Sequence, residues 1–309
     1  MTGSVLRYVV HRVLLAVLVV AGVSIVSFGL LFLSGDPAAA LAGDNWTRTQ
    51  IDEFRHQMGF DRPWYVQYGD FVSHAVRGDF GTSLREHRPV FELLMERMPA
   101  TLELTGTAFG ISAVLGIALG VVSATRRRSL YDRAVLVLTL AGQSMPVFWV
   151  GTMLILVFAV RLGWLPIAGM GGLSHLVLPA TALGFFPVAR NARVVRSSML
   201  EVLGADYVRT ARAKGLPGPR VLLGHALRNA LLPVVTLLAL DIGYLLSGAV
   251  ITESIFAWPG VGRLTVAAVL GKDLPLVEAA VVVLAAGFVM INLTVDLCYG
   301  VIDPRVRFE

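Results

Sequence analysis

Runs of about twenty apolar residues, separated by short polar segments, recur along almost the whole chain. A transmembrane helix needs about 20 predominantly apolar residues, and six segments approach or exceed that length. The predicted spans are residues 13–33, 104–125, 134–160, a stretch within 162–189, 229–252 and 279–295. The pattern therefore predicts an all-α membrane protein with six transmembrane helices.

Residues at the edges of these runs refine the predicted spans. Arg7, His11 and Arg12 precede the first run, as in a signal peptide. The run is too long for a typical signal sequence and lacks an A-x-A-like cleavage site, so it predicts a retained helix. Pro99 and Glu103 are typical of the first turn of a helix, and the second span is expected to be entered there.

Prolines also fall inside two of the predicted spans. Pro146 lies within the third, and the fourth is interrupted by glycines and by Pro166, Pro179 and Pro187. Proline removes a backbone N–H donor and kinks a helix, which in a membrane serves either a hinge or close helix packing. The fourth span is therefore expected to be broken up.

Composition agrees with a membrane protein and narrows its chemistry. Of 309 residues, 56% are hydrophobic and 15% are charged, whereas a soluble domain has roughly 25% charged residues. The single cysteine, Cys298, excludes an intramolecular disulfide and a cysteine-based zinc site. The motif G-x-x-x-x-G-K-S/T is absent, and the GKD tripeptide at 271–273 lacks its flanking residues. We therefore expect no nucleotide site, no catalytic site and no metal site.

Positive charges are unevenly distributed between the predicted loops. The 125–133 connection carries four arginines, whereas the 162–175 connection carries neither lysine nor arginine. Basic loops stay in the cytoplasm, so the N- and C-termini, the second loop and the fourth loop are predicted to be cytoplasmic. Residues 1–98 then form one transmembrane helix and an extracytoplasmic helical loop, and residues 99–309 form a five-helix core. Basic loops account for the net charge of +5, so no nucleic-acid partner is expected.

The predicted outer loop, residues 34–98, contains two short helical patterns. Apolar residues recur at helical spacing, first Ile51, Phe54 and Met58, and then Tyr65, Tyr68 and Val72. The sequence RGDFGTS at 77–83 is typical of a turn. A small helical cap is expected here rather than a separate domain.

The stretch ADYVRTARAKGLPGPRVLLGHALRNALLP, residues 205–233, is basic and is punctuated by glycine and proline. An acid at its start and bases toward its end predict a short helix over 206–214, ended by Gly215 and Pro217. One face of this helix carries Tyr207, Val208 and Ala211, and another carries Arg209 and Arg212. The helix either lies on anionic lipid or docks on a soluble protein.

Ionisable residues inside membrane spans are costly and mark functional positions by default. Asp241, near the middle of the fifth span, is either a pore-facing residue or a buried acid that pairs with a neighbouring helix. Asp296, near the cytoplasmic end of the last span, is expected to pair with a basic residue. Arg190, Arg193 and Arg196 are expected to continue the fourth helix into the cytoplasm.

The 205–233 stretch closely resembles the cytoplasmic "EAA" loop of binding-protein-dependent ABC importer permeases, in the dipeptide/oligopeptide/nickel branch. Four further segments resemble this family in the same order: GDPAAALAG at 35–43, the outer-loop segments DRPWYVQYGDF and RGDFGTSLREHRPVFELLMERMPATLELT, SGAVITESIFAWPGVGRL at 247–264 and NLTVDLCYGVIDPRVR at 292–307. The resemblance covers nearly the whole chain.

The loop departs from the general EAA motif in two places. With Gly215 as the motif's glycine, Arg209 stands where the general motif has glutamate, and Arg228 stands where it has proline. Thr210 and Ala211 occupy the two alanine positions, and Leu227 occupies the leucine position. The peptide branch is similar to this chain at the departing positions, so the departures narrow the subfamily.

The resemblance implies one half of a type I ABC importer in the plasma membrane of a prokaryote, a multi-pass permease subunit that is not an enzyme. Its expected partners are a second, homologous permease in a heterodimer, two ATP-binding subunits that carry ATP and Mg, an extracytoplasmic substrate-binding protein and membrane lipid. The chain itself is expected to bind no cofactor. Peptides are the expected cargo, with nickel, glutathione or haem-type cargo as alternatives. The coupling loop is expected at about 201–233, with its helix seated on an ATPase through Asp206, Tyr207, Arg209, Thr210, Ala211, Arg212, Ala213, Lys214 and Gly215.

Two other classes of protein fit the sequence less well. A secondary transporter carries mid-membrane charges in both halves and inverted repeats, whereas Asp241 is the one such residue here and no repeat is visible. An intramembrane enzyme needs a catalytic constellation. Ser144 in GQSM lacks the rest of a serine protease motif, and none of the six histidines pairs at metal-ligand spacing.

Overall fold

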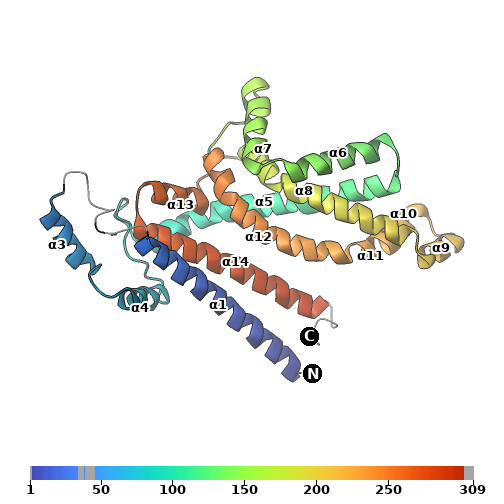
Figure 1. The fold of residues 1–309 in the computed structure, drawn as a ribbon. Helices are drawn as coiled ribbons and strands as arrows, with labels where there is room; N and C mark the ends of the chain where they lie inside the picture. The colour runs from blue at the N-terminus through green and yellow to red at the C-terminus, as the bar shows by residue number, and fades with distance from the viewer. Residues whose placement is uncertain (1, 34–37, 39–45, 303–309) are drawn as a thin grey trace. The chain divides into compact units, whose positions relative to one another are not determined.

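The computed structural model describes residues 2–33, 38 and 46–302, and this part of the chain consists of helices, turns and loops without a β-strand (Figure 1). The longer helices are α1 (Thr2–Leu33), α3 (Arg48–Met58), α4 (Trp64–Ala75), α5 (Val90–Thr125), α6 (Leu130–Ser144), α7 (Val147–Leu154), α8 (Leu173–Leu203), α9 (Asp206–Ala213), α12 (Leu232–Ile255), α13 (Val261–Leu270) and α14 (Leu274–Ile302). Short pieces join them: the π-helical segments η1 (Ile155–Arg161) and η2 (Val221–Leu227), and the single turns α10 (Gly218–Arg220) and α11 (Arg228–Ala230).

Five of the described helices are long and apolar enough to cross a membrane: α1, α5, α8, α12 and α14. The chain bends by 115° between α6 and α7–η1. This bent pair makes a sixth span if it crosses the membrane as one unit. The predicted all-α membrane fold is confirmed, and six spans are reached with this bent pair. The side of the membrane on which each loop lies stays a prediction.

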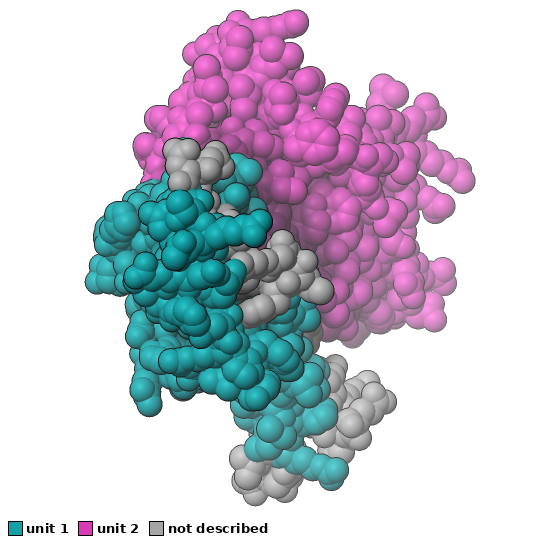
Figure 2. All heavy atoms as spheres, turned by 60° about the vertical axis from the view of Figure 1, so that its left-hand side comes forward, with its two compact units in different colours: residues 1–99, 260–309 teal, residues 100–259 magenta. Residues whose placement is uncertain are grey.

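The chain divides into two compact units, coloured separately in Figure 2. Residues 1–99 and 260–309 form unit 1, and residues 100–259 form unit 2. The sequence-based division after residue 98 describes membrane topology rather than packing, and it stays a prediction. In the packed structure, the last two helices join the N-terminal part of the chain.

In unit 1, α1 and α14 lie side by side and run antiparallel (Figure 1). The start of α5 packs with α13 and α14 through buried apolar residues, among them Val90, Leu94, Val261, Ala268, Leu276 and Ala279. A polar tie closes this region: the buried carboxylate of Asp273 accepts hydrogen bonds from the Ser83 hydroxyl and, at 3.2 and 3.3 Å, from the amides of Leu84 and Arg85. The aspartate of the GKD tripeptide therefore organises a turn.

The predicted helical patterns of the outer loop form α3 and α4. A capping box begins α3, because the Gln50 side chain accepts from the Thr47 amide at 2.8 Å and the Thr47 hydroxyl accepts from the Gln50 amide. Gly59, at φ +70°, ends it. Across this cap, His56 Nδ1 in the last turn of α3 lies 2.8 Å from Asp61 Oδ2, and this hydrogen bond lowers the pKa of Asp61.

In unit 2, α8 is the central helix and packs against α6, α7 and α12. Small residues permit close approach: a Cβ on Gly116 or Gly120 of α5 would lie 2.7 or 2.5 Å from the Cβ of Asn191 or Val195 on α8. A Cβ on Gly142 of α6 would likewise lie 2.5 Å from the Cβ of Ala189. The sequence Gly116-x-x-x-Gly120 is thus the small-residue motif by which membrane helices pack.

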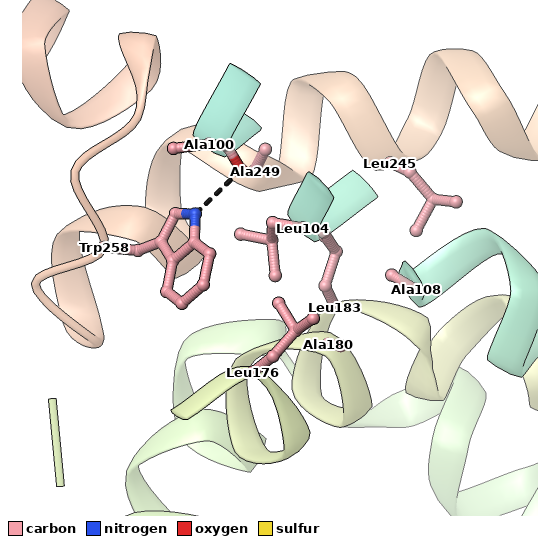
Figure 3. Packing of buried hydrophobic residues seen from close by; sticks show 9 residues of the cluster. All are labelled: Ala100, Leu104, Ala108, Leu176, Ala180, Leu183, Leu245, Ala249 and Trp258. Atoms are coloured by element: carbon pink, nitrogen blue, oxygen red, sulfur yellow. Dashed lines mark hydrogen bonds between the residues drawn. The ribbon is translucent and has the colours of Figure 1, made fainter. Parts of the chain in front are cut away.

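A buried cluster at the other end of these helices surrounds Trp258 (Figure 3). Its indole Nε1 donates to the Ala100 carbonyl at 2.8 Å, with Leu104, Leu176 and Leu183 packed in the same cluster. Nearby in sequence, the fully buried Glu253 accepts from the Thr101 hydroxyl at 2.7 Å. The SGAVITESIFAWPGVGRL segment therefore supplies core residues.

Three predicted spans differ from the structure at their prolines. The second span does not begin at Pro99, because α5 starts at Val90 and continues through it. The third span breaks at Met145 and Pro146, both extended, because a proline disfavours helical backbone in the residue before it. The fourth is broken up only before Leu173, where Pro166 and several glycines lie in a loop. From there α8 runs continuously through Pro179 and Pro187, whose lost backbone bonds are tolerated inside tightly packed helices.

Some predicted features lie outside the residues that the structure describes. The GDPAAALAG segment at 35–43 falls there apart from Ala38. Asp296 lies on α14, but its side chain is outside the described part, as is that of Cys298. The predicted ion pair of Asp296 therefore stays a prediction.

Candidate functional site

The predicted docking helix forms as α9, between the end of α8 and the turn at Gly215 (Figure 1). Asp206 occupies its first turn and Arg212 its last, as the helix dipole favours. Gly215 has φ +76° and its amide donates to the Arg212 carbonyl at 2.9 Å. The left-handed conformation favours glycine at this position.

One face of α9 packs on its own chain. Val208 and Ala211 are buried against Val221, the first residue of η2. This corrects the expectation that Tyr207, Val208 and Ala211 form one strip that faces an ATPase, because two of the three are covered inside the chain. Tyr207 is exposed, and its hydroxyl accepts from Asn229 Nδ2 at 3.1 Å.

The other face of α9 is exposed and charged. It consists of Asp206, Tyr207, Arg209, Thr210, Arg212, Ala213, Lys214 and the following Gly215. Asp206 and Arg209 form an ion pair at 3.3 Å whose side chains are 95% and 72% exposed. A Cβ on Gly215 would meet no atom within 4 Å in the part of the chain that the structure describes. Tyr207 contacts Asn229, but the charged residues of this surface form no ion pair with another element in the described part of the chain.

A buried carboxylate fastens α8 to α6 about two turns before α8 ends. Asp132 accepts from Arg196 through Nε at 2.7 Å and Nη2 at 3.1 Å, from the Ser123 hydroxyl at 2.6 Å and from the Arg128 amide at 2.9 Å. The predicted continuation of the fourth helix through Arg190, Arg193 and Arg196 is confirmed, and its extension into the cytoplasm stays a prediction. Asp132 was missed because the predicted third span started at Ala134. The available signal was a single acid among the four arginines of the 125–133 connection.

A second ion pair joins α8 to α12. Asp241 is fully buried, pairs with Arg190, and accepts from Asn191 Nδ2 at 2.6 Å. Arg190 Nη2 also donates to the Leu237 carbonyl at 3.3 Å. This arrangement is the one expected of a helix-packing acid, whereas Arg190, 22% exposed, is the member of the pair that reaches the surface of the subunit.

Metal ligation and catalysis find little support in the described residues. Within them, no group of three or more His, Cys, Asp or Glu side chains lies close enough to hold a metal ion. Ser144 donates its hydroxyl to the Leu140 carbonyl at 2.9 Å, as serines inside helices often do.

Known proteins resemble this chain over nearly its whole length. Residues 116–308 match the family described as "Binding-protein-dependent transport system inner membrane component", and residues 5–105 match its N-terminal component. The chain belongs to this family of transport permeases. It is accordingly a multi-pass protein of the prokaryotic plasma membrane and a transport subunit of an ABC importer.

Individual relatives of this chain are also transport system permeases. The chain is 39% identical to the di/tripeptide transport system permease of Pseudomonas aeruginosa, over 98% of this chain and 99% of the relative. It is 40% identical to the glutathione transport system permease of Escherichia coli K12, over 98% and 100%. A solved structure of the MetNI methionine ABC transporter is similar with a TM-score of 0.58 and 19% identity, over 68% of this chain and 96% of that one. At that identity, the structure shows the permease fold alone.

Proposed function

We propose that this chain and a second, similar permease form the membrane pathway of an ATP-driven importer of short peptides. The assignment of short peptides as the cargo rests on the 38–40% identity, over 98% of the chain, to permeases named for di/tripeptides, dipeptides and glutathione. Glutathione is itself a tripeptide, so all three names describe short peptides. An extracytoplasmic binding protein delivers the cargo.

ATP and Mg²⁺ belong to two partner ATPases in this proposal, because the sequence of the chain contains no P-loop motif. The exposed face of α9 is the proposed contact with one of them. It is composed of Asp206, Tyr207, Arg209, Thr210, Arg212, Ala213, Lys214 and Gly215. Ala211 acts from the other side of the helix, where it seats α9 on η2.

The packing of α9 supports a role as a lever. Val208 and Ala211 fix the helix on Val221, and Arg196 fixes the end of α8 through the buried Asp132. A displacement imposed on α9 by an ATPase is therefore passed to α8 instead of being absorbed by a loose loop. Because α8 is the central helix of unit 2, its movement shifts the packing of the membrane pathway between two states.

Crosslinking tests the proposed ATPase contact. A cysteine that replaces Ala213, in a Cys298→Ser background, is expected to crosslink to a cysteine on the ATPase with an efficiency that changes on nucleotide binding. A matched cysteine at Leu130, exposed on α6, is expected not to crosslink. Absence of a crosslink at Ala213, with loss of transport that follows only total positive charge, would favour a helix that lies on lipid.

Uptake measurements test the cargo. The complex of two permeases, two ATPases and binding protein is reconstituted in liposomes, and ATP-dependent uptake of labelled dipeptides, tripeptides, glutathione, nickel and haem is measured. Uptake of dipeptides or tripeptides supports the proposal. Uptake of glutathione alone narrows the cargo to that tripeptide, and uptake of nickel or haem without peptide refutes peptide import.

A labelling experiment tests the predicted orientation. Cysteines at Thr210 and Arg77, both exposed, are expected to react with membrane-impermeant reagents only from the cytoplasmic side and only from the outside, respectively. The opposite pattern would invert every loop assignment.

A further inference from the structure

The exposed faces of the membrane helices differ in chemistry. On α1 the exposed residues in the apolar part are aliphatic, as expected of a surface in lipid; they include Val13, Leu14, Val17, Leu18, Ile25 and Val26. The exposed face of α12 is mixed: it consists of Thr236, Leu240, Tyr244, Ser247, Ile251 and Ser254, and four of these six residues carry a hydroxyl group. These six positions follow one another at intervals of three or four residues and therefore share a single face.

Tyr244 lies at the middle of this face and of α12 itself. Its ring packs on Phe186 of α8, with ring centroids 4.8 Å apart, and the Arg190 guanidinium lies 5.8 Å from the Phe186 ring centroid. Tyr244 is 37% exposed, and the Arg190 side chain is 22% exposed. A cation and a phenol thus reach the surface of the subunit at mid-span.

Such groups are costly against lipid. Ionisable side chains within transmembrane segments almost always face a bundle interior or a water-filled cavity. Serine can satisfy itself inside a helix, and Ser247 and Ser254 do so by donating to carbonyls four residues earlier. The part-exposed Arg190 and Tyr244 are the groups that set this face apart from the aliphatic surface of α1.

We propose that the hydroxyl-bearing face of α12, together with Phe186 and Arg190 of α8, lines the water-filled cargo pathway, and that Arg190 and Tyr244 donate hydrogen bonds to carbonyl or carboxylate oxygens of the peptide. This inference rests on the proposed function. Arg190 suits the role because its described hydrogen bonds, to Asp241 and to the Leu237 carbonyl, both use Nη2. Nη1 is left to the pathway, whereas Nε is buried and has no hydrogen-bond partner among the described residues.

The ion pair with Asp241 explains how a cation can serve a pathway without trapping cargo. Asp241 neutralises Arg190 and is itself fully buried. A passing carboxylate therefore meets a hydrogen-bond donor whose charge is balanced, and Phe186 and Tyr244 give it an aromatic wall. The site recognises the polar backbone groups that all short peptides share, and it does not discriminate between the side chains of the cargo.

Cysteine accessibility tests the pathway directly, because Cys298 is the single native cysteine. In a Cys298→Ser background, cysteines at Thr236, Tyr244 and Ser247 are expected to react with a charged methanethiosulfonate reagent in the assembled complex. Val114 on α5, 67% exposed and aliphatic, provides the matched control and is expected to remain unlabelled. Labelling of Tyr244→Cys no faster than that of Val114→Cys would overturn the proposal.

Conservative variants test the peptide contact. Tyr244→Phe removes one hydroxyl, and Arg190→Lys keeps the charge that Asp241 needs while it removes donors. Each is expected to lower peptide uptake about five-fold or more at normal complex yield. The control Tyr131→Phe, at an exposed tyrosine of α6, is expected to keep full uptake.

The outcomes separate the two proposals. A wild-type complex that imports no peptide refutes the proposed function, while the cysteine labelling still decides whether this face meets water. A wild-type complex that imports peptide, with Tyr244→Phe and Arg190→Lys both at wild-type uptake, refutes the contact proposed for Arg190 and Tyr244.

Discussion

Arg190 and Arg196 on α8 pair with carboxylates that are almost completely buried, whereas Arg209 on α9 pairs with one that is almost completely exposed. The side chains of Asp241 and Asp132 are 0% and 5% exposed, and that of Asp206 is 95% exposed. The first two pairs hold helices of one chain together. The third lies on a surface whose charged residues form no ion pair with another element in the described part of the chain.

The difference separates two uses of charge in one protein. A buried ion pair contributes little net stability over an apolar pair, but removal of one partner leaves an uncompensated charge and is strongly destabilising. An exposed pair contributes little whether present or absent. Variants that remove one charge of an α8 pair should therefore change assembly, and variants on the exposed face of α9 should change transport while assembly remains intact.

The largest effect is expected for Asp241→Asn. The variant leaves the Arg190 cation without its buried carboxylate, so the free energy of unfolding should fall by about 3–5 kcal/mol. The yield of detergent-solubilised complex, measured by size-exclusion chromatography with fluorescence detection, should drop sharply.

The double variant Arg190→Gln/Asp241→Asn controls for this prediction. It removes both charges, so its yield should recover above that of Asp241→Asn alone. A yield equal to wild type in Asp241→Asn, with altered transport, would instead show that Asp241 acts in the pore and is not needed for packing.

Asp132→Asn is expected to have the next largest effect. The change weakens the hydrogen bonds that tie Arg196 and Ser123 to the start of α6, at a cost of about 1–3 kcal/mol. The thermal midpoint of the purified complex should fall, and transport should fall with it. An unchanged midpoint would mean that α8 is held to α6 by its apolar contacts alone.

The outcome at prolines shows what sequence reasoning could and could not predict. The apolar runs predicted the spans because hydropathy is a local property. Met145 and Pro146 end α6, whereas α8 continues through Pro179 and Pro187. Tolerance of a proline depends on how neighbouring helices enclose it, and no single-chain pattern contains that information.

The candidate site shows the same limit. Charge order and Gly215 predicted the position of α9 to within one residue. The assignment of Val208 and Ala211 to a surface for a partner was wrong, because amphipathicity identifies an apolar face but not what covers it. Asp132 and Asp241 pair with Arg196 and Arg190, which are 64 and 51 residues away in the sequence. Only the folded structure shows that these residues lie close together.

Gly215→Val tests the role of the turn that ends α9. A β-branched residue at φ +76° is strained, at about 1–2 kcal/mol, but its Cβ would meet no atom of the described residues within 4 Å. The complex of two permeases should therefore form in near-normal yield, while ATP hydrolysis no longer drives uptake. Gly215→Asn, which tolerates the left-handed conformation, is the control and should retain more uptake.

The smallest effect on stability is expected for Arg209→Gln. Its partner Asp206 is exposed, and water replaces the ion pair at little cost, so the thermal midpoint should not change measurably. If the exposed face of α9 contacts an ATPase, the same variant should still weaken ATPase association, and the loss should be greatest at low salt because the charges act between two proteins.

Arg126→Gln, which removes an arginine from the basic 125–133 loop outside α9, is the matched control. Equal losses in both variants would mean that total basic charge matters, as for a helix on anionic lipid. A loss confined to Arg209→Gln would mean that Arg209 itself contacts the ATPase, as the exposure of its side chain permits.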